Sequence, residues 1–281
     1  MNSIKDINNN INRINTIKDI SSIFEKIASI KINQIRQDVS ARKEFYDDIW
    51  DIYVKLKAGN YNDDKVSKNQ NKINRTAYII VSSNSGLIGD MNNKIINLLK
   101  KEIKDKEKVA TGKYDVFVIG DKGKRILELE NIKYVKNYTF KDEVNDEFTK
   151  EILDDIENYR AVFVLYEEYI SLQEQNVRMQ NLSIDISSIP KEDVIEQEEY
   201  IFEPSYKDVL DYFESVMKGQ MFAQILYESQ LSQYASRMIA MSTANSKATT
   251  MYNDEIVDLN KVKRKTKDEN ARILFESFKR S

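Results

Sequence analysis

The sequence predicts an α/β protein in which a long antiparallel coiled coil of N- and C-terminal helices carries a Rossmann-like α/β central domain. The positions of the turn-forming residues give the first evidence. Every glycine except Gly219, and both prolines, lie between residues 59 and 204, and helix interiors disfavour both residue types. Within that middle, short β-branched and aromatic runs alternate with helix-like stretches, as in parallel α/β sheets. We therefore divide the chain into a first helix (1–58), a sheet domain with an acidic linker (59–204) and a last helix (205–281).

The first arm has isoleucines at helical spacing. Ile4, Ile7, Ile11 and Ile14 follow each other at intervals of three and four residues, which places them on one stripe of a helix and matches the start of a coiled-coil seam. A helix from about Ser3 to about Lys57 would be roughly 80 Å long at ~1.5 Å per residue. Much of it must therefore project beyond any domain that the chain can form.

The last arm has a similar apolar pattern. Val209, Phe213, Val216 and Met217 begin it, and Leu259 lies near its end. Two long helices at opposite ends of a chain can shield such stripes by pairing antiparallel. The same stripes would also suit the core of a helical bundle.

The middle contains the predicted sheet. Three runs are typical of strands, and the stretches between them favour helices. The strands are 77–83, 114–119 and 161–166, and the helices lie near 91–108 and 142–158. The alternating run "QNVRMQNLSIDI", beginning at Gln175, predicts a further strand at an antiparallel edge, and 185–204 is the linker back to the last helix.

The stretch "VSSNSGLIGDMNNKI" (81–95) has the strand–glycine loop–helix order of a phosphate site. A P-loop requires G-x-x-x-x-G-K-[ST], and a dinucleotide site requires G-x-G-x-x-G. The loop has only Gly86 and Gly89, followed by Asp90, whose charge would repel phosphate. We therefore assign Gly86 and Gly89 to a structural loop in which they permit tight packing, and we expect no cofactor on this chain.

Composition excludes several kinds of chemistry. The chain has no Cys and no His, which removes disulfides, thiol nucleophiles, cysteine metal sites and the commonest general base. We therefore predict no catalytic residue and no metal site. The sequence also lacks an apolar run long enough to cross a membrane, and the absence of Cys agrees with a cytoplasmic protein.

Motifs along the whole chain match one family in order. The loop residues Gly86, Leu87, Gly89 and Asn92 match its D-R-G-L-C-G-G-L-N turn, and "YIFEPS" (200–205) matches its E-P-S motif before the last helix. The strongest match is "LYESQLSQYASRMIAMSTANSKA" (226–248). Its agreeing residues are Glu228, Ser229, Ser232, Arg237, Met238, Ala240, Met241 and Ala244. In these motifs the chain resembles the γ subunit of F-type ATP synthases, the central rotor shaft of the F1 motor.

The resemblance implies a non-catalytic shaft inside an α3β3 hexamer, whose α and β subunits bind ATP or ADP and Mg. It further implies an ε-like subunit and a c-ring, or another membrane-linked assembly, as partners. The chain would then be peripheral on the inner face of the cell membrane, without nucleic acid.

The resemblance also implies the contact residues. Phe24 replaces the family's shaft methionine, and the basic run "KVKRK" (261–265) lies where the family contacts a β-subunit loop. Lys263 stands in for the family's arginine, and Arg264 replaces its glutamine. We expect Phe24, Lys261, Lys263, Arg264 and Lys265 to contact β subunits.

Three alternatives remain open from the sequence. The departures from the family motifs fit an F1-like ATPase paralogue whose hydrolysis drives other work, such as gliding motility. A Rossmann-like enzyme with helical extensions is the second. The third is a helical scaffold or nucleic-acid binder that uses the basic run.

Overall fold

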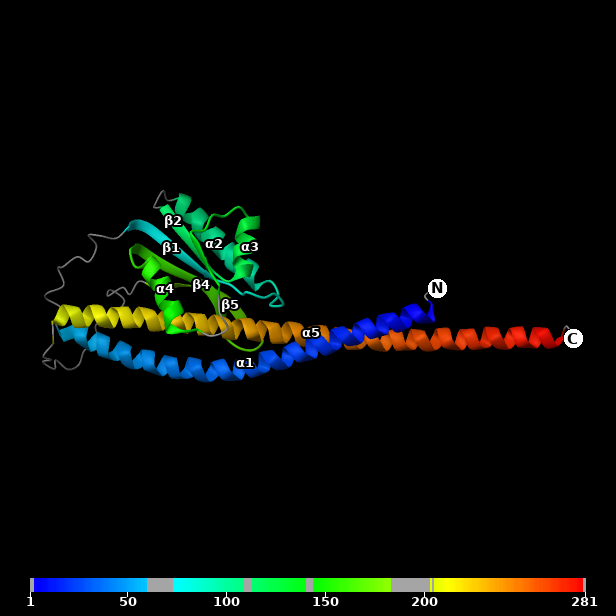
Figure 1. Ribbon diagram of the computed structural model, residues 1–281. Helices are drawn as coiled ribbons and strands as arrows, with labels where there is room; N and C mark the ends of the chain where they lie inside the picture. Colours follow the sequence, from blue (N-terminus) through cyan, green and yellow to red (C-terminus); the bar gives the residue numbers. More distant parts are fainter. Residues whose placement is uncertain are drawn as a thin grey trace. The chain divides into compact units, whose positions relative to one another are not determined.

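The computed structural model describes residues 3–59, 73–108, 113–139, 144–182, 203 and 205–279 (Figure 1). Their elements, in chain order, are α1 (Ile4–Gly59), β1 (Ile73–Val81), α2 (Met91–Lys108), β2 (Lys113–Ile119), α3 (Asp121–Leu129), β3 (Lys136–Tyr138), α4 (Asp146–Ile156), β4 (Tyr159–Tyr169), β5 (Gln175–Asn181) and α5 (Tyr206–Lys279). They form two compact units. The coiled-coil unit takes the described residues of 1–30 and 237–281, and the sheet unit takes those of 31–236.

Both long helices begin with the same capping arrangement. Ser3 Oγ accepts the amide of Asp6 at 3.2 Å, while the Ser3 amide donates to the Asp6 carboxylate at 3.1 Å. Ser205 Oγ likewise accepts the amide of Asp208 at 3.2 Å and donates to its carboxylate at 2.6 Å. A serine followed three residues later by an acidic residue thus satisfies amides that the helix leaves unpaired.

The coiled-coil unit confirms that the N- and C-terminal helices pair antiparallel. Ile7, Ile11 and Leu259 are buried together, and Ile4, Tyr252, Ile256 and Val262 pack around them. Asn10 donates to Glu255 at 3.4 Å, and Lys18 lies 5.9 Å from the ring centre of Tyr252. Residues further along α1 therefore contact residues nearer the start of α5, so the two helices run in opposite directions.

The sheet has the order β3-β2-β1-β4-β5. β1 pairs in parallel with β2 and β4, and β3 pairs in parallel with β2. β5 pairs antiparallel with β4 at the edge. The expected parallel, Rossmann-like sheet and its antiparallel edge strand are therefore confirmed.

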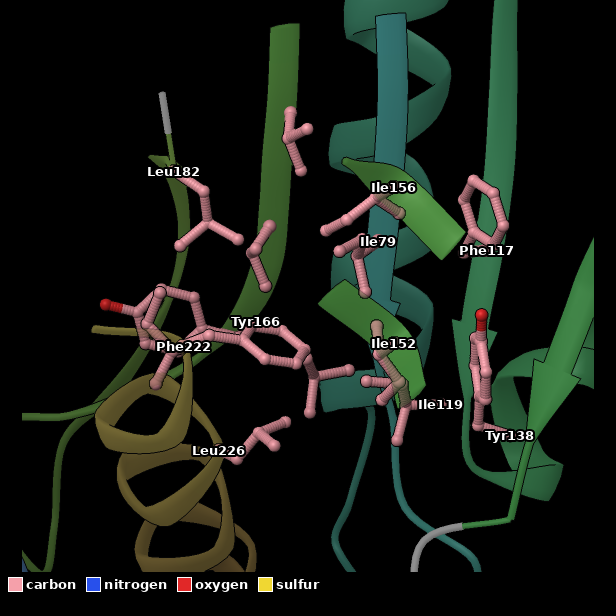
Figure 2. Packing of buried hydrophobic residues seen from close by; sticks show 14 of the residues in the cluster. Ile79, Phe117, Ile119, Tyr138, Ile152, Ile156, Tyr166, Leu182, Phe222 and Leu226 are labelled. Atoms are coloured by element: carbon pink, nitrogen blue, oxygen red, sulfur yellow. The ribbon is translucent and has the colours of Figure 1, made fainter. Parts of the chain in front are cut away.

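Helices cover both faces of the sheet. On one face, side chains of β1, β2 and β4 pack with Ile152 and Ile156 of α4 and with Phe222 and Leu226 of α5 (Figure 2). On the other face, Ile95, Leu99 and Ile103 of α2 and Leu127 of α3 pack against residues such as Tyr78 and Ile80. α5 therefore forms part of the sheet's helical layer as well as half of the coiled coil.

Contacts from α1 to α5 continue within the sheet unit. Ile49 and Tyr53 of α1 are buried with Leu210 and Met217 of α5. The Tyr53 hydroxyl donates to Glu214 at 3.1 Å. Burying these side chains on both helices stabilises their pairing beside the sheet.

Arg42 of α1 extends these contacts to the segment before α4. Its guanidinium lies 4.7 Å from the ring centre of Tyr227 on α5. The Tyr227 hydroxyl in turn donates to the carbonyl of Val144 at 3.0 Å. These contacts connect α1, α5 and the sheet's covering layer.

The short elements depart from expectation. α3 and β3 were not predicted, and the helix expected near 142–158 begins at Asp146, because the Asn145 side chain accepts the amide of Phe148 at 2.9 Å and caps it. β5 ends at Asn181. Leu182 is described directly after β5, but residues 183–186 of the run predicted from Gln175 lie outside the described residues, as does the whole predicted linker except Glu203.

Candidate functional site

The loop of residues 82–90 follows β1 at the carboxyl edge of the sheet, where open α/β folds bind ligands. Phosphate sites of this kind use the free amides at a helix N-terminus. Here the first amides of α3 already have acceptors within the chain. The backbone amide of Gly123 donates to Ser82 Oγ at 2.9 Å. The amide of Lys122 donates to the carbonyl of Ser83 at 3.0 Å. The amide of Asp121 donates to Asn84 Oδ1 at 3.4 Å. These amides are therefore committed to the loop rather than to a ligand.

The same loop is closed on the α2 side. Asn92 is 8% exposed, accepts the amide of Ser83 at 3.2 Å and donates to its hydroxyl at 3.1 Å. The Ser83 hydroxyl donates to the carbonyl of Ser85 at 2.7 Å. Ile88 of the loop is buried at 2% exposure. Because these side chains bond to the loop itself, we assign the loop a structural role.

The close packing expected at Gly86 and Gly89 is found at two other glycines. A Cβ at Gly86 would lie 3.8 Å from its nearest neighbour, the Lys122 side chain, and a Cβ at Gly89 would have no atom within 4 Å. A Cβ at Gly120 would lie 2.3 Å from the Ser82 carbonyl oxygen, and one at Gly123 would lie 2.4 Å from Ser82 Oγ. Gly89 instead provides a φ of +67°, a value that glycine adopts most readily.

Phe24 lies on α1 in the coiled-coil unit and is 38% exposed. It belongs to a stripe of apolar side chains that this unit does not cover. The stripe consists of Ile17, Ile20, Ile23, Phe24, Ile27 and Ile30. Small buried residues, Ser21 and Ala28, lie on the covered side of the same stretch. An apolar stripe of this length on a helix surface is typical of a protein interface.

The basic run lies on α5 in the same unit. Lys261, Lys263, Arg264 and Lys265 are all exposed, and Lys261 pairs with Asp258 at 2.9 Å. Val262, between them, packs on the cluster of Ile7 and Leu259. The apolar residue therefore fixes this stretch of α5 while its neighbours direct positive charge outward.

Phe24 and the basic run do not form one site. Val262 packs in the cluster that contains Ile4, and Phe24 lies twenty residues further along α1. That separation is about 30 Å at ~1.5 Å per residue. The predicted contact residues therefore lie at two levels of the coiled coil.

Three further apolar residues near the end of α5 were missed from the sequence. Ile273, Leu274 and Phe275 are 65%, 57% and 80% exposed. Successive helical residues differ by about 100° in direction, so these three point to different sides of the helix. The signal was present in "RILF" (272–275), an apolar cluster that follows a long polar stretch.

Buried Tyr78 and half-buried Tyr159 have raised pKa values. Burial raises the pKa of Tyr78 to about 12, and burial together with the hydrogen bond to Asp115 raises the pKa of Tyr159 to about 12. Both hydroxyls therefore stay protonated near neutral pH. In the described part of the chain, no three acidic side chains gather as they would to hold a metal ion. No described helix is apolar over the length needed to cross a membrane.

Comparison with known families settles the identity of this arrangement. The family model described as ATP synthase matches residues 3–267. The chain belongs to the γ-subunit family of ATP synthases. Members of this family are non-catalytic subunits. The chain is accordingly the central rotor shaft of an F-type ATP synthase.

Solved structures of two mitochondrial ATP synthases contain chains with the same fold. A chain of the central stalk and c-ring of the Tetrahymena thermophila mitochondrial ATP synthase has a TM-score of 0.61 and 18% identity, covering 80% of this chain and 99% of that chain. A chain of the Euglena gracilis mitochondrial ATP synthase rotor has a TM-score of 0.59 and 16% identity, covering 91% of this chain and 96% of that chain. At such identities the likeness shows the fold alone.

Proposed function

We propose that this γ subunit turns within an α3β3 ring and couples its rotation to the conformations of the ring's catalytic sites. The observation that carries the proposal is the pairing of two unlike helices. α1 carries the exposed apolar stripe around Phe24, whereas α5 carries exposed cations. Such a shaft presents a different surface to each subunit around it. Differential contact shifts a conformational equilibrium, and the resulting coupling acts in both directions.

The stripe around Phe24 and the basic run suit different kinds of partner side chain. The stripe around Phe24 takes apolar side chains of β subunits, because each such contact removes apolar area from water. Lys261, Lys263, Arg264 and Lys265 take acidic side chains of β subunits. Exposed ion pairs contribute only about 0–1 kcal/mol each, so the basic run steers and adjusts the shaft rather than anchoring it.

The end of α5 supports enclosure by a ring. A single helix with Ile273, Leu274 and Phe275 exposed on several sides has no single face on which to dock. A surrounding apolar wall would cover all three. Smooth apolar contact without directional hydrogen bonds is also compatible with rotation.

The remaining partners follow from the family. The α and β subunits bind ATP or ADP and Mg, and this chain binds none of them. An ε-like subunit and a c-ring attach at the sheet unit, which places the complex on the inner face of the membrane. A chain of the Tetrahymena central stalk and c-ring structure has this fold.

The alternatives of the sequence analysis are less favoured. The matching family is ATP synthase, and nothing in the comparisons supports a gliding motor. The paired amides of α3 disfavour a Rossmann-like enzyme. Acidic β-subunit residues account for the basic run without nucleic acid.

Co-purification of the native complex tests the proposal. The exposed turn between β4 and β5, at Leu172 and Gln173, accepts an affinity tag far along the chain from the coiled-coil unit. We expect α and β chains in a three-to-one ratio to this subunit, together with c-subunits. Recovery of α and β chains with other partners and no c-subunits would argue for a repurposed motor. Recovery of no α or β chains would reject the ring.

A further inference from the structure

A cleft lies in the sheet unit, and no residue of the loop 82–90 lines it. It has a volume of about 640 Å³, within the range of small-molecule sites. Its walls come from the starts of β1 and β2, from α2, and from the segment between α3 and β3. The cleft therefore opens at the amino end of the parallel strands. Ligands of open α/β folds bind at the opposite end, so the fold alone does not explain it.

The charged residues around the cleft are mostly positive. Arg75, Lys100, Lys104 and Lys133 line it, against a single carboxylate, Asp115. Asp115 is already committed, because it forms an ion pair with Arg75 and accepts the hydroxyl of Tyr159 at 2.9 Å. Arg75, one of the four cations, therefore neutralises Asp115, the carboxylate that lines the cleft.

The remaining cations differ in their pairing. Lys100 forms an ion pair with Glu130 at 2.7 Å. Lys104 and Lys133 are exposed, and neither forms an ion pair with a carboxylate in the part of the chain that the structure describes. They come from different walls, α2 and the α3–β3 segment. Two such cations from different elements make the cleft attractive to an anion.

The interior of the cleft is apolar. Ile103 and Val116 line the cleft but are already buried in the core, whereas Ile132 and Tyr114 are half-buried and supply its accessible apolar surface. Apolar walls favour a ligand that brings apolar area of its own. A simple inorganic anion would leave this part of the cleft uncovered.

From the apolar floor and the two cations we infer that this cleft binds a small organic anion. Its apolar or aromatic body lies against Tyr114 and Ile132, and its carboxylate, sulfonate or phosphate group pairs with Lys104 and Lys133. The inference is independent of the shaft's contacts with the ring, because every residue of the cleft belongs to the sheet unit.

Fluorescence titration of the purified full chain with 1-anilinonaphthalene-8-sulfonate tests this site. The probe combines an aromatic body with one sulfonate. We expect saturable binding that K104E/K133E weakens at least tenfold, because two attractions become repulsions. Lys104→Arg with Lys133→Arg retains the charge and should keep the affinity within about threefold. The double variant R125E/K207E, which makes the same charge change at exposed positions outside the cleft, should bind as the wild type does.

Competition separates the two halves of the inference. 2-Naphthoate should displace the probe, whereas inorganic phosphate at equal ionic strength should not. Displacement of the probe by phosphate but not by 2-naphthoate would overturn the proposed contact with the apolar walls. Equal weakening in K104E/K133E and R125E/K207E would overturn the site, as would an absence of saturable binding in the wild type. Thermal unfolding of every variant checks folding, and K104Q/K133Q replaces the reversal if that variant unfolds early.

Discussion

The backbone at Gly120 passes close to Ser82, where β2 leads into α3. Gly120 has a φ of +97°, and a Cβ there would lie 2.3 Å from the Ser82 carbonyl oxygen. The neighbouring Gly123 amide donates to Ser82 Oγ. Glycine is therefore required at 120 both for its backbone conformation and for the space.

Alanine substitutions at Gly120 and Gly86 should differ strongly. Gly120→Ala combines a positive φ, which costs about 1–2 kcal/mol, with a backbone clash, and we expect a loss of roughly 3 kcal/mol or more in the free energy of unfolding. In Gly86→Ala the new Cβ would lie 3.8 Å from the Lys122 side chain, an ordinary contact. This substitution should change the free energy of unfolding by no more than about 1 kcal/mol. Urea unfolding of both variants checks this. Equal losses would contradict the assignment of close packing to Gly120.

Single residues were the least predictable from the sequence. The glycine pair at 86 and 89 was recognised as a loop, but close packing fell on Gly120 and Gly123. The deciding neighbour, Ser82, is about forty residues away in sequence and adjacent only because β1 pairs with β2. The predicted contacts of Phe24 and the basic run remain predictions, since they depend on partner chains.

At the scale of elements, a small charged network joins β3 to α4. Lys136 donates to Asp155 at 2.7 Å and to Glu151 at 3.0 Å, and the Tyr138 hydroxyl donates to Asp155 at 2.5 Å. The hydrogen bond from Lys136 and that from Tyr138 lower the pKa of Asp155. The short edge strand β3 is thus tied to a helix through the ionised carboxylate.

Because the folded pKa of Asp155 is depressed, its contribution to stability is present above its unfolded pKa of about 3.9. It is lost as the pH falls through the folded value. Asp155→Asn should therefore cost about 1 kcal/mol near neutral pH, and this difference should shrink below about pH 4. Denaturant unfolding at a series of pH values measures it. Asp154→Asn, at an exposed neighbouring position, is the control, and a pH-independent difference for Asp155 would contradict the network.

The pairing of α1 with α5 depends on the buried seam rather than on every isoleucine. Ile11→Ala, at 8% exposure, should cost about 2–4 kcal/mol. Ile17→Ala, on the same helix but 53% exposed, should cost less than about 1 kcal/mol. Hydrogen exchange of α1 amides in the coiled-coil unit reports the difference. Similar exchange in the two variants would count against the seam.

Elements were predictable where a pattern was long. The isoleucine spacing of α1 and the strand–helix alternation from β1 to β4 extend over many residues, so local irregularities do not hide them. α3 was missed because Gly123 interrupts its sequence, and β3 because three residues carry no periodicity. β5 ends at Asn181, and residues 183–186 of the run predicted as a strand lie outside the described residues, so that part stays a prediction.

At the scale of the whole molecule, the basic run should affect turnover of the assembled motor. Reversal of Lys263, Arg264 and Lys265 to Glu should slow ATP hydrolysis by the complex by about tenfold. That factor corresponds to ~1.4 kcal/mol shared among three exposed interactions of up to about 1 kcal/mol each. Lys263→Ala alone should have less than about a threefold effect. Steady-state ATPase assays of purified complexes measure both.

The matched control for that prediction reverses three exposed cations outside the coiled-coil unit, Lys101, Arg125 and Lys207. Its turnover should stay close to that of the wild type. Unchanged turnover in a fully assembled Lys263, Arg264 and Lys265 variant would remove these residues from the contact surface.

Rotation of the single molecule is the most direct test of the shaft. The chain has no Cys, so Lys101→Cys gives one unique attachment point on this subunit for a bead. With the α3β3 ring fixed to a surface, ATP should drive the bead in steps in one direction. A complex that hydrolyses ATP while the bead only fluctuates would contradict the central claim that this chain is the rotor.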